Sequence, residues 1–249
     1  MQGRSSDAVV LLSGGVDSAT TLAIAARDGR RCHAVTFRYG QRHVLEVEAA
    51  VRVAKALGAT DHRILDIPLG EFAPSALTDP SATVPKGRTE NDMRAGIPAT
   101  YVPARNTIFL AFALALAEAT ESDSIYIGVN AVDYSGYPDC RPEYVEAFAH
   151  LAALATRRAA EGRPTQIVAP LLSLSKAEII RTGVQLGVDY SLTLSCYDPD
   201  EQGRACGACD SCLLRRRGFI EAGVPDPTRY RPGVTFPPAA RAGRNRREP

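Results

Sequence analysis

The stretch Val9–Ser18, which reads VVLLSGGVDS, limits the possible fold more than any other part of the chain. Its four leading apolar residues are typical of a strand buried on both faces of a parallel sheet. Gly14 and Gly15 follow, and glycines allow positive φ and lack a Cβ, so backbone N–H groups can surround an oxyanion. A helix from Ser18 to Asp28, ended by Gly29, comes next. The stretch therefore predicts an anion-binding loop between a strand and a helix.

This loop lacks the residues of two common phosphate-binding loops. A Walker A loop needs a lysine after its last glycine, where this chain has Val16 and Asp17. The G-x-G-x-x-G fingerprint is also absent. Because Asp17 would repel phosphate, it predicts Mg²⁺ between its carboxylate and a nucleotide. The pattern Ser-Gly-Gly-x-Asp-Ser instead resembles the PP-loop of the ATP pyrophosphatase superfamily, whose members typically cleave ATP between the α and β phosphates and adenylate their substrate.

The length and composition of the chain predict a cytoplasmic globular protein. Its 249 residues, 45% of them hydrophobic, can bury a full core. A net charge of +1 gives no global indication of nucleic-acid or membrane binding. No apolar run approaches the roughly 20 residues of a membrane span, and the N-terminus lacks the apolar segment of a signal peptide. The late cysteines stand at metal-ligand spacing, which suits a reducing compartment.

Apolar segments that alternate with amphipathic ones predict an α/β fold with a doubly wound, mainly parallel five-stranded sheet. The expected strands are Val9–Leu12, Arg31–Phe37, His62–Ile67, Ser124–Val129 and Gln166–Ala169. The helix after the second strand has apolar residues at helical spacing, at Val44, Val47, Val51, Ala54 and Leu57. Ligands of such sheets bind beyond the carboxyl ends of the strands, so Phe37 and Tyr39 could flank an adenine. A plain strand end with a turn glycine is the alternative.

Two cations stand at the beginnings of expected helices, where positive charge opposes the helix dipole by about 0.3–1 kcal/mol. Arg105 precedes an apolar helix over Thr107–Ala119. Lys176 lies in the first turn of a helix that begins with the capping-box pair Ser175 and Glu178. A bound anion would offset this cost. We therefore expect both side chains to face phosphates, an acyl-adenylate or a substrate carboxylate, with a solvated surface position as the alternative for Lys176.

Residues 68–98 show no periodicity and are rich in Pro, Gly, Ser, Thr and charge. A segment of about thirty such residues inside a compact domain is usually a functional loop. We expect it to form a flap that closes over the site and is poorly ordered without substrate.

The loop after the fourth strand, Gly128–Glu143, is dense in polar groups. A carboxylate can accept two parallel hydrogen bonds from a guanine-like edge, and tyrosine rings can stack on its face. The loop therefore predicts a site for a flat heterocycle, with a polar connector as the alternative. The expected substrate-binding residues are Asn130, Asp133, Tyr134, Tyr137 and Asp139. A helix over Glu143–Glu161 should follow.

Four late cysteines are the second strong motif. Cys196 stands ten positions before Cys206, and Cys209 and Cys212 follow at three-residue spacing. This Cys₄ pattern fits tetrahedral Zn²⁺, while iron–sulfur ligation is the alternative. Structural zinc contributes about 10–16 kcal/mol in finger peptides, enough to order an irregular segment.

The motifs also suggest a division of the chain. We expect an ATP-binding α/β domain over residues 1–190, a zinc-binding segment with a closing helix over residues 191–231, and a tail over residues 232–249. The tail is rich in Pro, Ala, Gly and Arg, which predicts disorder. A solvated tail is favoured over one that contacts RNA, so no stable nucleic-acid complex is expected.

Together these motifs resemble the 7-cyano-7-deazaguanine synthase family of queuosine biosynthesis, a PP-loop family. The groups that carry the resemblance are Ser13–Ser18, Tyr39–His43, Tyr101–Asn106, Gly128–Glu143, Ser195–Tyr197 and Cys206–Cys212. The resemblance implies an adenine nucleotide alpha hydrolase-like fold and an ATP-dependent ligase that converts 7-carboxy-7-deazaguanine and ammonia to 7-cyano-7-deazaguanine. It also implies a homodimer with one structural zinc per subunit.

The chemistry assigns roles to residues under this resemblance. A carboxylate resists amination, so it must first become an adenylate, and the resulting amide must be activated again to lose its oxygen. Lys176, Arg105 and Asp17 are the expected catalytic residues. The positions expected to bind ATP, with Mg²⁺, are Leu11, Leu12, Ser13, Gly14, Gly15, Val16, Asp17, Ser18, Phe37 and Tyr39.

Two alternatives stay open at this stage. A PP-loop tRNA-thiolation enzyme would also adenylate its substrate, but it needs a persulfide-bearing thiol. A zinc nucleic-acid module on an inert α/β domain would bind RNA in a salt-dependent way and consume no ATP.

Overall fold

The structure, a computed structural model, describes residues 6–130 and 136–236. Its centre is a five-stranded parallel sheet with the strand order β3-β2-β1-β4-β5. The strands are β1 (Asp7–Leu11), β2 (Arg31–Arg38), β3 (Asp61–Asp66), β4 (Ser124–Tyr126) and β5 (Gln166–Val168). All five strands expected from the sequence are present, and the doubly wound architecture is confirmed.

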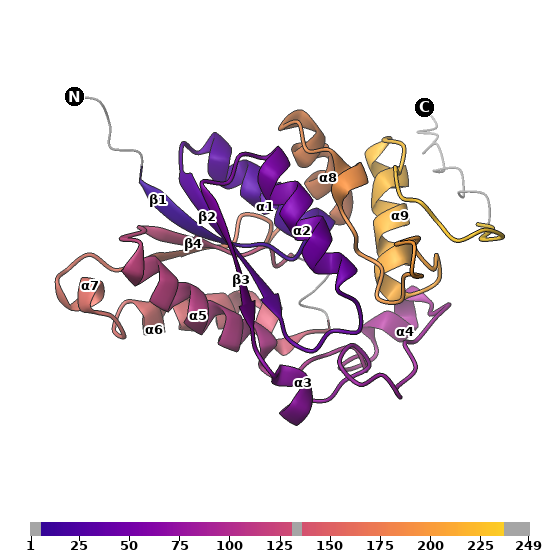
Figure 1. Ribbon diagram of the computed structural model, residues 1–249, viewed down its shortest axis with the longest axis horizontal. Coiled ribbons are helices and arrows are strands. Elements are labelled where there is room, and N and C mark those ends of the chain that lie inside the picture. The colour runs from indigo at the N-terminus through magenta and orange to yellow at the C-terminus, as the bar shows by residue number, and fades with distance from the viewer. Residues whose placement is uncertain (1–5, 131–135, 237–249) are drawn as a thin grey trace, which may run out of the picture.

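Helices cover both faces of this sheet (Figure 1). The helices are α1 (Val16–Arg27), α2 (Leu45–Ala56), α3 (Leu69–Phe72), α4 (Glu90–Arg94), α5 (Arg105–Ala119), α6 (Pro142–Ala152), α7 (Arg157–Ala160), α8 (Lys176–Gln185) and α9 (Asp210–Ala222), with 3₁₀ turns η2 (Pro138–Cys140) and η3 (Tyr190–Leu192). Helices α1, α2 and α8 lie on one face, and α5 and α6 lie on the other (Figure 1). None of the helices in residues 6–130 and 136–236 is both long enough and apolar enough to cross a membrane.

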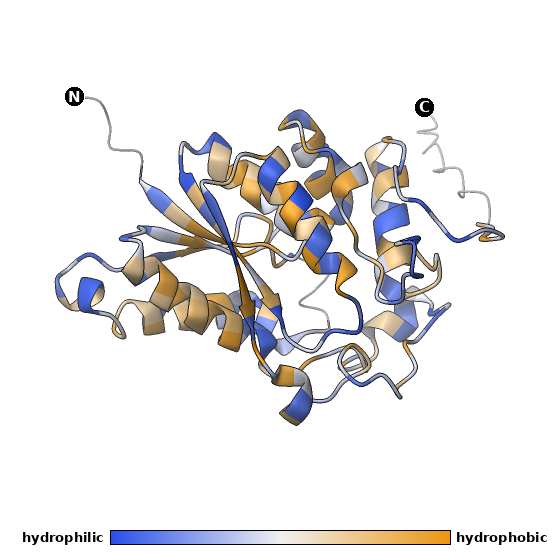
Figure 2. Ribbon diagram, in the orientation of Figure 1, coloured by the Kyte–Doolittle hydropathy of each residue, from blue (hydrophilic) through white to orange (hydrophobic). Residues whose placement is uncertain are grey.

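The central strand β1 supplies side chains to two separate cores, because successive residues of a strand point to opposite faces. Val9 and Leu11 pack in the core with α5 and α6. Ala8 and Val10 pack in the core with α1, α2 and α8. Figure 2 shows hydrophobic residues along the strands, mixed with hydrophilic ones in β2 and β3. Burial on both faces explains the continuous apolar run that opens the chain.

Two helix predictions need correction. The helix expected over Glu143–Glu161 ends at Ala152, and α7 is a separate turn whose Ala159 N–H donates to the Thr156 hydroxyl. The apolar stripe expected on α2 is also rotated, because Val44 is 63% exposed and Val51 is 44% exposed. Small residues of α2 pack against the sheet and the glycine loop instead. The buried residues of α2 are Val47, Ala49, Ala50, Val53 and Ala54.

The aperiodic segment 68–98 carries only the short helices α3 and α4, and it lies against residues 195–212, the cysteine segment (Figure 1). The Gly87 N–H donates to the Ala208 carbonyl at 2.8 Å, and Lys86 forms an antiparallel bridge with Cys209. The Arg88 guanidinium pairs with Asp210 at 2.8 Å. These contacts join two stretches of chain that are far apart in sequence. Closure of this segment over a substrate stays a prediction.

Candidate active site

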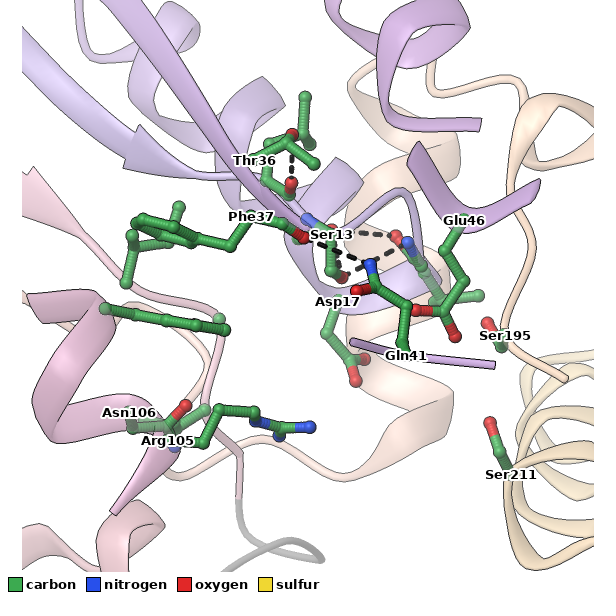
Figure 3. Close-up of a pocket in the computed structure, with 18 of the residues that line it drawn as sticks. Ser13, Asp17, Thr36, Phe37, Gln41, Glu46, Arg105, Asn106, Ser195 and Ser211 are labelled. Carbon is green, nitrogen blue, oxygen red and sulfur yellow. Dashed lines mark hydrogen bonds between the residues drawn. The ribbon is translucent and has the colours of Figure 1, made fainter. Parts of the chain in front are cut away.

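A cavity of about 250 Å³ opens at the carboxyl ends of β1, β2 and β4. The chain leaves β1 toward β2 on one side and later returns to β4 on the other, so this is the point where the strand order reverses. Ligands of open α/β sheets bind at such a point. Figure 3 shows side chains from the glycine loop, from α2 and α5, and from the cysteine segment turned toward one open space.

The glycine loop forms the wall of this cavity at the start of α1. The Ser18 hydroxyl accepts from the Ser13 N–H at 3.2 Å and lies 3.0 Å from the Ser13 hydroxyl. Gly15 is the N-cap of α1, and no side chain caps that helix end. The uncapped N–H groups and the positive end of the helix dipole favour an anion here.

Gly14 has a φ of +84°, a value that only glycine adopts without strain. A Cβ at this position would lie 2.5 Å from the Glu46 carbonyl oxygen and 2.6 Å from the Ala50 nitrogen. The first turn of α2 therefore packs directly on the loop, at a distance that excludes any side chain on Gly14.

Gly14→Ala is expected to destabilise the protein more than Gly58→Ala does. Both positions have positive φ, which costs an alanine about 1–2 kcal/mol. A Cβ on Gly58 has no atom within 4 Å, whereas one on Gly14 collides with backbone. Overpacking adds about 1–3 kcal/mol, so thermal melts should place the Tm of Gly14→Ala roughly 5 °C below that of Gly58→Ala. Equal Tm values would contradict the close approach of α2.

Asp17 and Lys176 form an ion pair inside the cavity. The Lys176 Nζ lies 2.8 Å from Asp17 Oδ1 and 2.6 Å from Oδ2. Asn130 Nδ2 donates to the same carboxylate at 3.2 Å. The sequence predicted that Asp17 needs a cation if phosphate is to bind nearby. In the structure, Lys176 supplies a positive charge at that carboxylate.

The backbone around Lys176 explains how it reaches Asp17. Lys176 is the first residue of α8, after the capping box that Ser175 and Glu178 form in both directions. A Cβ on Gly218 of α9 would lie 2.4 Å from the Lys176 Cγ, so the missing side chain leaves room for the lysine stem. The capping box predicted from the sequence is confirmed.

Arg105 and three aromatic rings form the opposite wall. Arg105 is the first residue of α5, and its guanidinium carbon lies 5.8 Å from the centre of the Tyr39 ring. Figure 3 shows the Arg105 side chain extending into the cavity. The Phe37 ring stacks on Phe109 with centroids 4.2 Å apart. All four side chains line the cavity, so a flat ligand would find aromatic and cationic surface there.

The predicted substrate-binding residues do not all line the cavity. Tyr137 does, and its hydroxyl lies 2.8 Å from the Thr100 hydroxyl. Asp139 is buried, accepts from the Asn106 N–H at 2.9 Å near the start of α5, and is not among the cavity-lining residues. Asn130 holds Asp17, as described above. Asp133 and Tyr134 lie outside the described residues, and all five substrate roles stay predictions.

The four late cysteines form a buried cluster that can hold a metal ion. The Sγ atoms of Cys196, Cys206, Cys209 and Cys212 all lie within 4.8 Å of one another. Thiolates about 2.3 Å from one tetrahedral ion would stand about 3.8 Å apart, so the cluster fits such an ion. Backbone N–H groups also point at the sulfurs, among them Cys206 N to Cys196 Sγ at 3.2 Å. Such donors stabilise negative charge on metal-binding thiolates.

Sequence comparison places the chain in a family. Residues 7–223 match the family model described as "Queuosine biosynthesis protein QueC". The chain belongs to this family. It is 62% identical over 226 residues to a 7-cyano-7-deazaguanine synthase of Desulfatibacillum aliphaticivorans, with 90% of the chain and 97% of that protein covered. It is 60% identical over 223 residues to the enzyme of the same name from Nitrosococcus oceani, covering 90% and 97%.

Solved structures align with the chain only at low sequence identity. The NMN synthetase of Francisella tularensis aligns with a TM-score of 0.48 and 17% identity, over 89% of this chain and 79% of that one. The five-stranded parallel sheet and the QueC family match agree with the expected adenine nucleotide alpha hydrolase-like fold.

The site of this QueC family member contains two charged residues that the sequence did not single out. Glu46 of α2 lines the cavity, and Figure 3 shows its carboxyl pointing into it near Ser195. Arg215 of α9 also lines the cavity, donating to the Thr193 hydroxyl at 2.8 Å and to Asp226 at 3.2 Å. Burial raises the pKa of Glu46 to about 7, and the positive charge of Arg105 opposes this rise.

The raised pKa of Glu46 predicts a loss of stability on the alkaline side. An ordinary Glu releases its proton near pH 4.5, whereas folded Glu46 keeps it until about pH 7. The folded protein thus binds more protons between these values, so its free energy of unfolding falls as the pH rises through this window. Glu46→Gln removes the effect. Urea unfolding at pH 4.5, 6 and 8 should show the variant gaining stability relative to the parent as the pH rises, and a constant difference would contradict the prediction.

Proposed function

We propose that this chain converts 7-carboxy-7-deazaguanine and ammonia to 7-cyano-7-deazaguanine at the expense of ATP. The observation that carries this proposal is 62% identity to a 7-cyano-7-deazaguanine synthase across 97% of that enzyme's length. The cavity supports it, because it combines an uncapped helix N-terminus with the side chains of Lys176 and Arg105. Such an arrangement suits the transfer of a phosphate-bearing group.

In this proposal, one cavity activates the substrate twice. Ser13, Gly14, Gly15 and Ser18 bind the phosphates at the start of α1, together with the neighbouring predicted ATP-contacting residues. Lys176 and Arg105 neutralise the charge that develops as the carboxylate oxygen attacks phosphorus. Ammonia then displaces AMP to give the amide, and the amide oxygen is activated in the same way before it leaves. Tyr39 and Phe37 offer ring surface for the adenine.

The proposal includes two metal ions, a structural Zn²⁺ and a Mg²⁺ that binds with ATP. Cys196, Cys206, Cys209 and Cys212 hold one structural Zn²⁺, which the burial of all four thiols supports. The carboxylate of Asp17 is an oxygen ligand of the kind that Mg²⁺ takes. Bound Mg²⁺ supplies positive charge that neutralises phosphate oxygens.

The proposal also covers the compartment, the oligomeric state and the division of the chain. We propose that the enzyme acts in the cytoplasm as a homodimer and that it forms no stable nucleic-acid complex. The division into residues 1–190, 191–231 and 232–249 is retained, with residues 237–249 outside the described part of the chain. Asn130, Asp133, Tyr134, Tyr137 and Asp139 are retained as the proposed surroundings of the deazapurine.

A direct assay tests the reaction. Purified protein with ATP, ammonium and 7-carboxy-7-deazaguanine should yield a product with the mass of the nitrile, and mixtures without ATP should yield none. Accumulation of the amide alone would contradict the second activation. Absence of any ATP-dependent product would contradict the proposed function.

The structure does not favour the tRNA-thiolation alternative. Four of the six cysteines form the metal cluster; Cys32 is 4% exposed on β2, and Cys140, in the cavity wall, is 4% exposed and accepts from Asn106 Nδ2 at 3.2 Å. A persulfide carrier needs a thiol that a sulfur donor can reach. Nitrile formation should therefore be independent of added sulfide.

A further inference from the structure

The proposed reaction requires a base that the assignments above do not supply. Ammonia carries three N–H bonds and a nitrile nitrogen carries none. One proton leaves nitrogen when the amide forms, one when the amide oxygen is activated, and one when that oxygen departs. General bases contribute about 10²–10⁴-fold to such proton transfers, so a group in the cavity has to accept them.

We propose that the Glu46 carboxylate accepts these protons from the substrate nitrogen. The inference rests on the proposed function. In the first step the C–N bond forms, the C–O bond to AMP breaks and the electron pair leaves with AMP, while one N–H proton moves to a Glu46 oxygen. Glu46 then passes the proton to water through the open side of the cavity and is ready for the next transfer.

The position of Glu46 beside the glycine loop supports this role. The carbon that reacts is bonded through oxygen to a phosphate held at that loop, so its base has to lie near the loop. The Glu46 backbone carbonyl packs against Gly14 so closely that a Cβ there would be 2.5 Å away. Figure 3 shows the Glu46 side chain directed from this point into the cavity.

The two carboxylates in the cavity, Glu46 and Asp17, differ in their hydrogen-bond partners. Both oxygens of Asp17 accept from Lys176 at 2.8 Å or less. Among the residues that the structure describes, the Glu46 carboxyl has no hydrogen bond or ion pair, and the positive charge of Arg105 is the one that acts on its pKa. A carboxylate without such partners can exchange a proton without breaking a contact. Its pKa of about 7 also suits a base that works near neutral pH.

Other titratable groups share this cavity and bear on its pH dependence. They are Asp17, Tyr39, Arg105, Tyr137, Cys140, Lys176, Tyr197 and Arg215. Burial raises the pKa of Tyr39 to about 12, so this phenol stays protonated where Glu46 titrates. Arg105 favours the ionised form of Glu46.

Glu46→Gln tests the proposal, because it keeps the shape of the side chain and removes its basicity. Glu48→Gln is the matched control, since Glu48 lies on the same helix with its side chain 58% exposed. ATP–pyrophosphate exchange that depends on 7-carboxy-7-deazaguanine, measured without ammonia, should stay within about threefold of the parent. Nitrile formation by Glu46→Gln should fall by about 10²–10⁴-fold, and Glu48→Gln should match the parent.

The pH profile distinguishes a base from a structural residue. With free ammonia rather than total ammonium held constant, the parent rate should rise through about pH 7 and then level off. Glu46→Gln should lack this rise, and Glu46→Asp should retain it at a reduced rate. The same pattern should appear when the amide is supplied directly, because its conversion still removes two protons from nitrogen.

The outcomes separate this inference from the function on which it rests. Equal losses of exchange and nitrile formation, or an unchanged pH profile in Glu46→Gln, would overturn the role of Glu46. Full nitrile formation by Glu46→Gln would overturn it as well. A parent protein that forms no nitrile would contradict the proposed function itself, and the assignment of Glu46 would fall with it.

Discussion

Lys176→Met is expected to lower the rate of nitrile formation by about 10²–10³-fold, in the range found when one transition-state charge contact is removed. Lys176 lies 2.6 Å from Asp17, and both line the cavity at the glycine loop. Without the lysine, the negative charge of Asp17 loses its protein partner at the place where phosphates are proposed to bind. The affinity for ATP should therefore fall together with the rate. Steady-state kinetics with the mass of the product as readout would measure both.

Lys55→Met provides the control for this substitution. The chain has three lysines, and Lys55 is an exposed residue of α2. Its replacement removes the same charge from the protein without touching the cavity, so the rate should stay near that of the parent. If Lys176→Met retained the parent turnover, the proposed role of Lys176 in charge neutralisation would be wrong.

Cys209→Ala is expected to remove the metal and to lower the Tm by on the order of 10 °C. Loss of a structural metal belongs to the small group of changes that cost more than about 4–5 kcal/mol, and each kcal/mol shifts the Tm of a chain of this size by about 2–4 °C. Cys209 is fully buried, is the N-cap of α9 and forms a bridge with Lys86. Elemental analysis and a thermal melt of the same sample would measure both effects.

Cys32→Ala is the matched control, because it removes a buried thiol from β2 that is not part of the cluster. It should keep the full metal content and lose much less stability. Full metal content in Cys209→Ala would contradict the four-cysteine site. Iron in the purified protein would favour the iron–sulfur alternative over zinc.

The strands were predictable because their signals are local. The central strand β1 is a short apolar run buried along its whole length, and burial on both faces of a parallel sheet requires only such a run. The capping box at Ser175 and Glu178 was predictable for the same reason, since both partners lie within one turn of helix. The cysteine cluster was indicated by spacing alone, although Cys196 reaches it across a loop.

The sequence did not identify Glu46 because the buried face of α2 is not the face on which Val44 and Val51 lie. The larger apolar residues Val44 and Val51 suggested one buried face, yet both are exposed. The glycine loop lies so close that alanines pack against it, and this turns Glu46 toward the cavity. Glu46 and Ala50 are four residues apart, so they lie on the same face of α2. Only the contact of both residues with Gly14 shows that this face is turned toward the glycine loop.

The polar loop after β4 shows a different limit. Its carboxylates look alike in sequence, but Asp139 accepts a hydrogen bond from the Asn106 backbone near the start of α5. The position at which α5 begins determines which carboxylate of the loop accepts a backbone hydrogen bond and so has a structural role. Residue type and spacing within the loop carry no information on that.

The contact between residues 68–98 and the cysteine segment has a consequence during protein synthesis. Val84 is buried among the cysteines, and Lys86 forms an isolated antiparallel bridge with Cys209. At about 5–20 residues per second, the ribosome needs on the order of ten seconds to proceed from one to the other. During that interval the earlier segment has emerged without the surface that covers it. The nascent chain must therefore keep Val84 from other polypeptides until the cysteines that cover it have been synthesised.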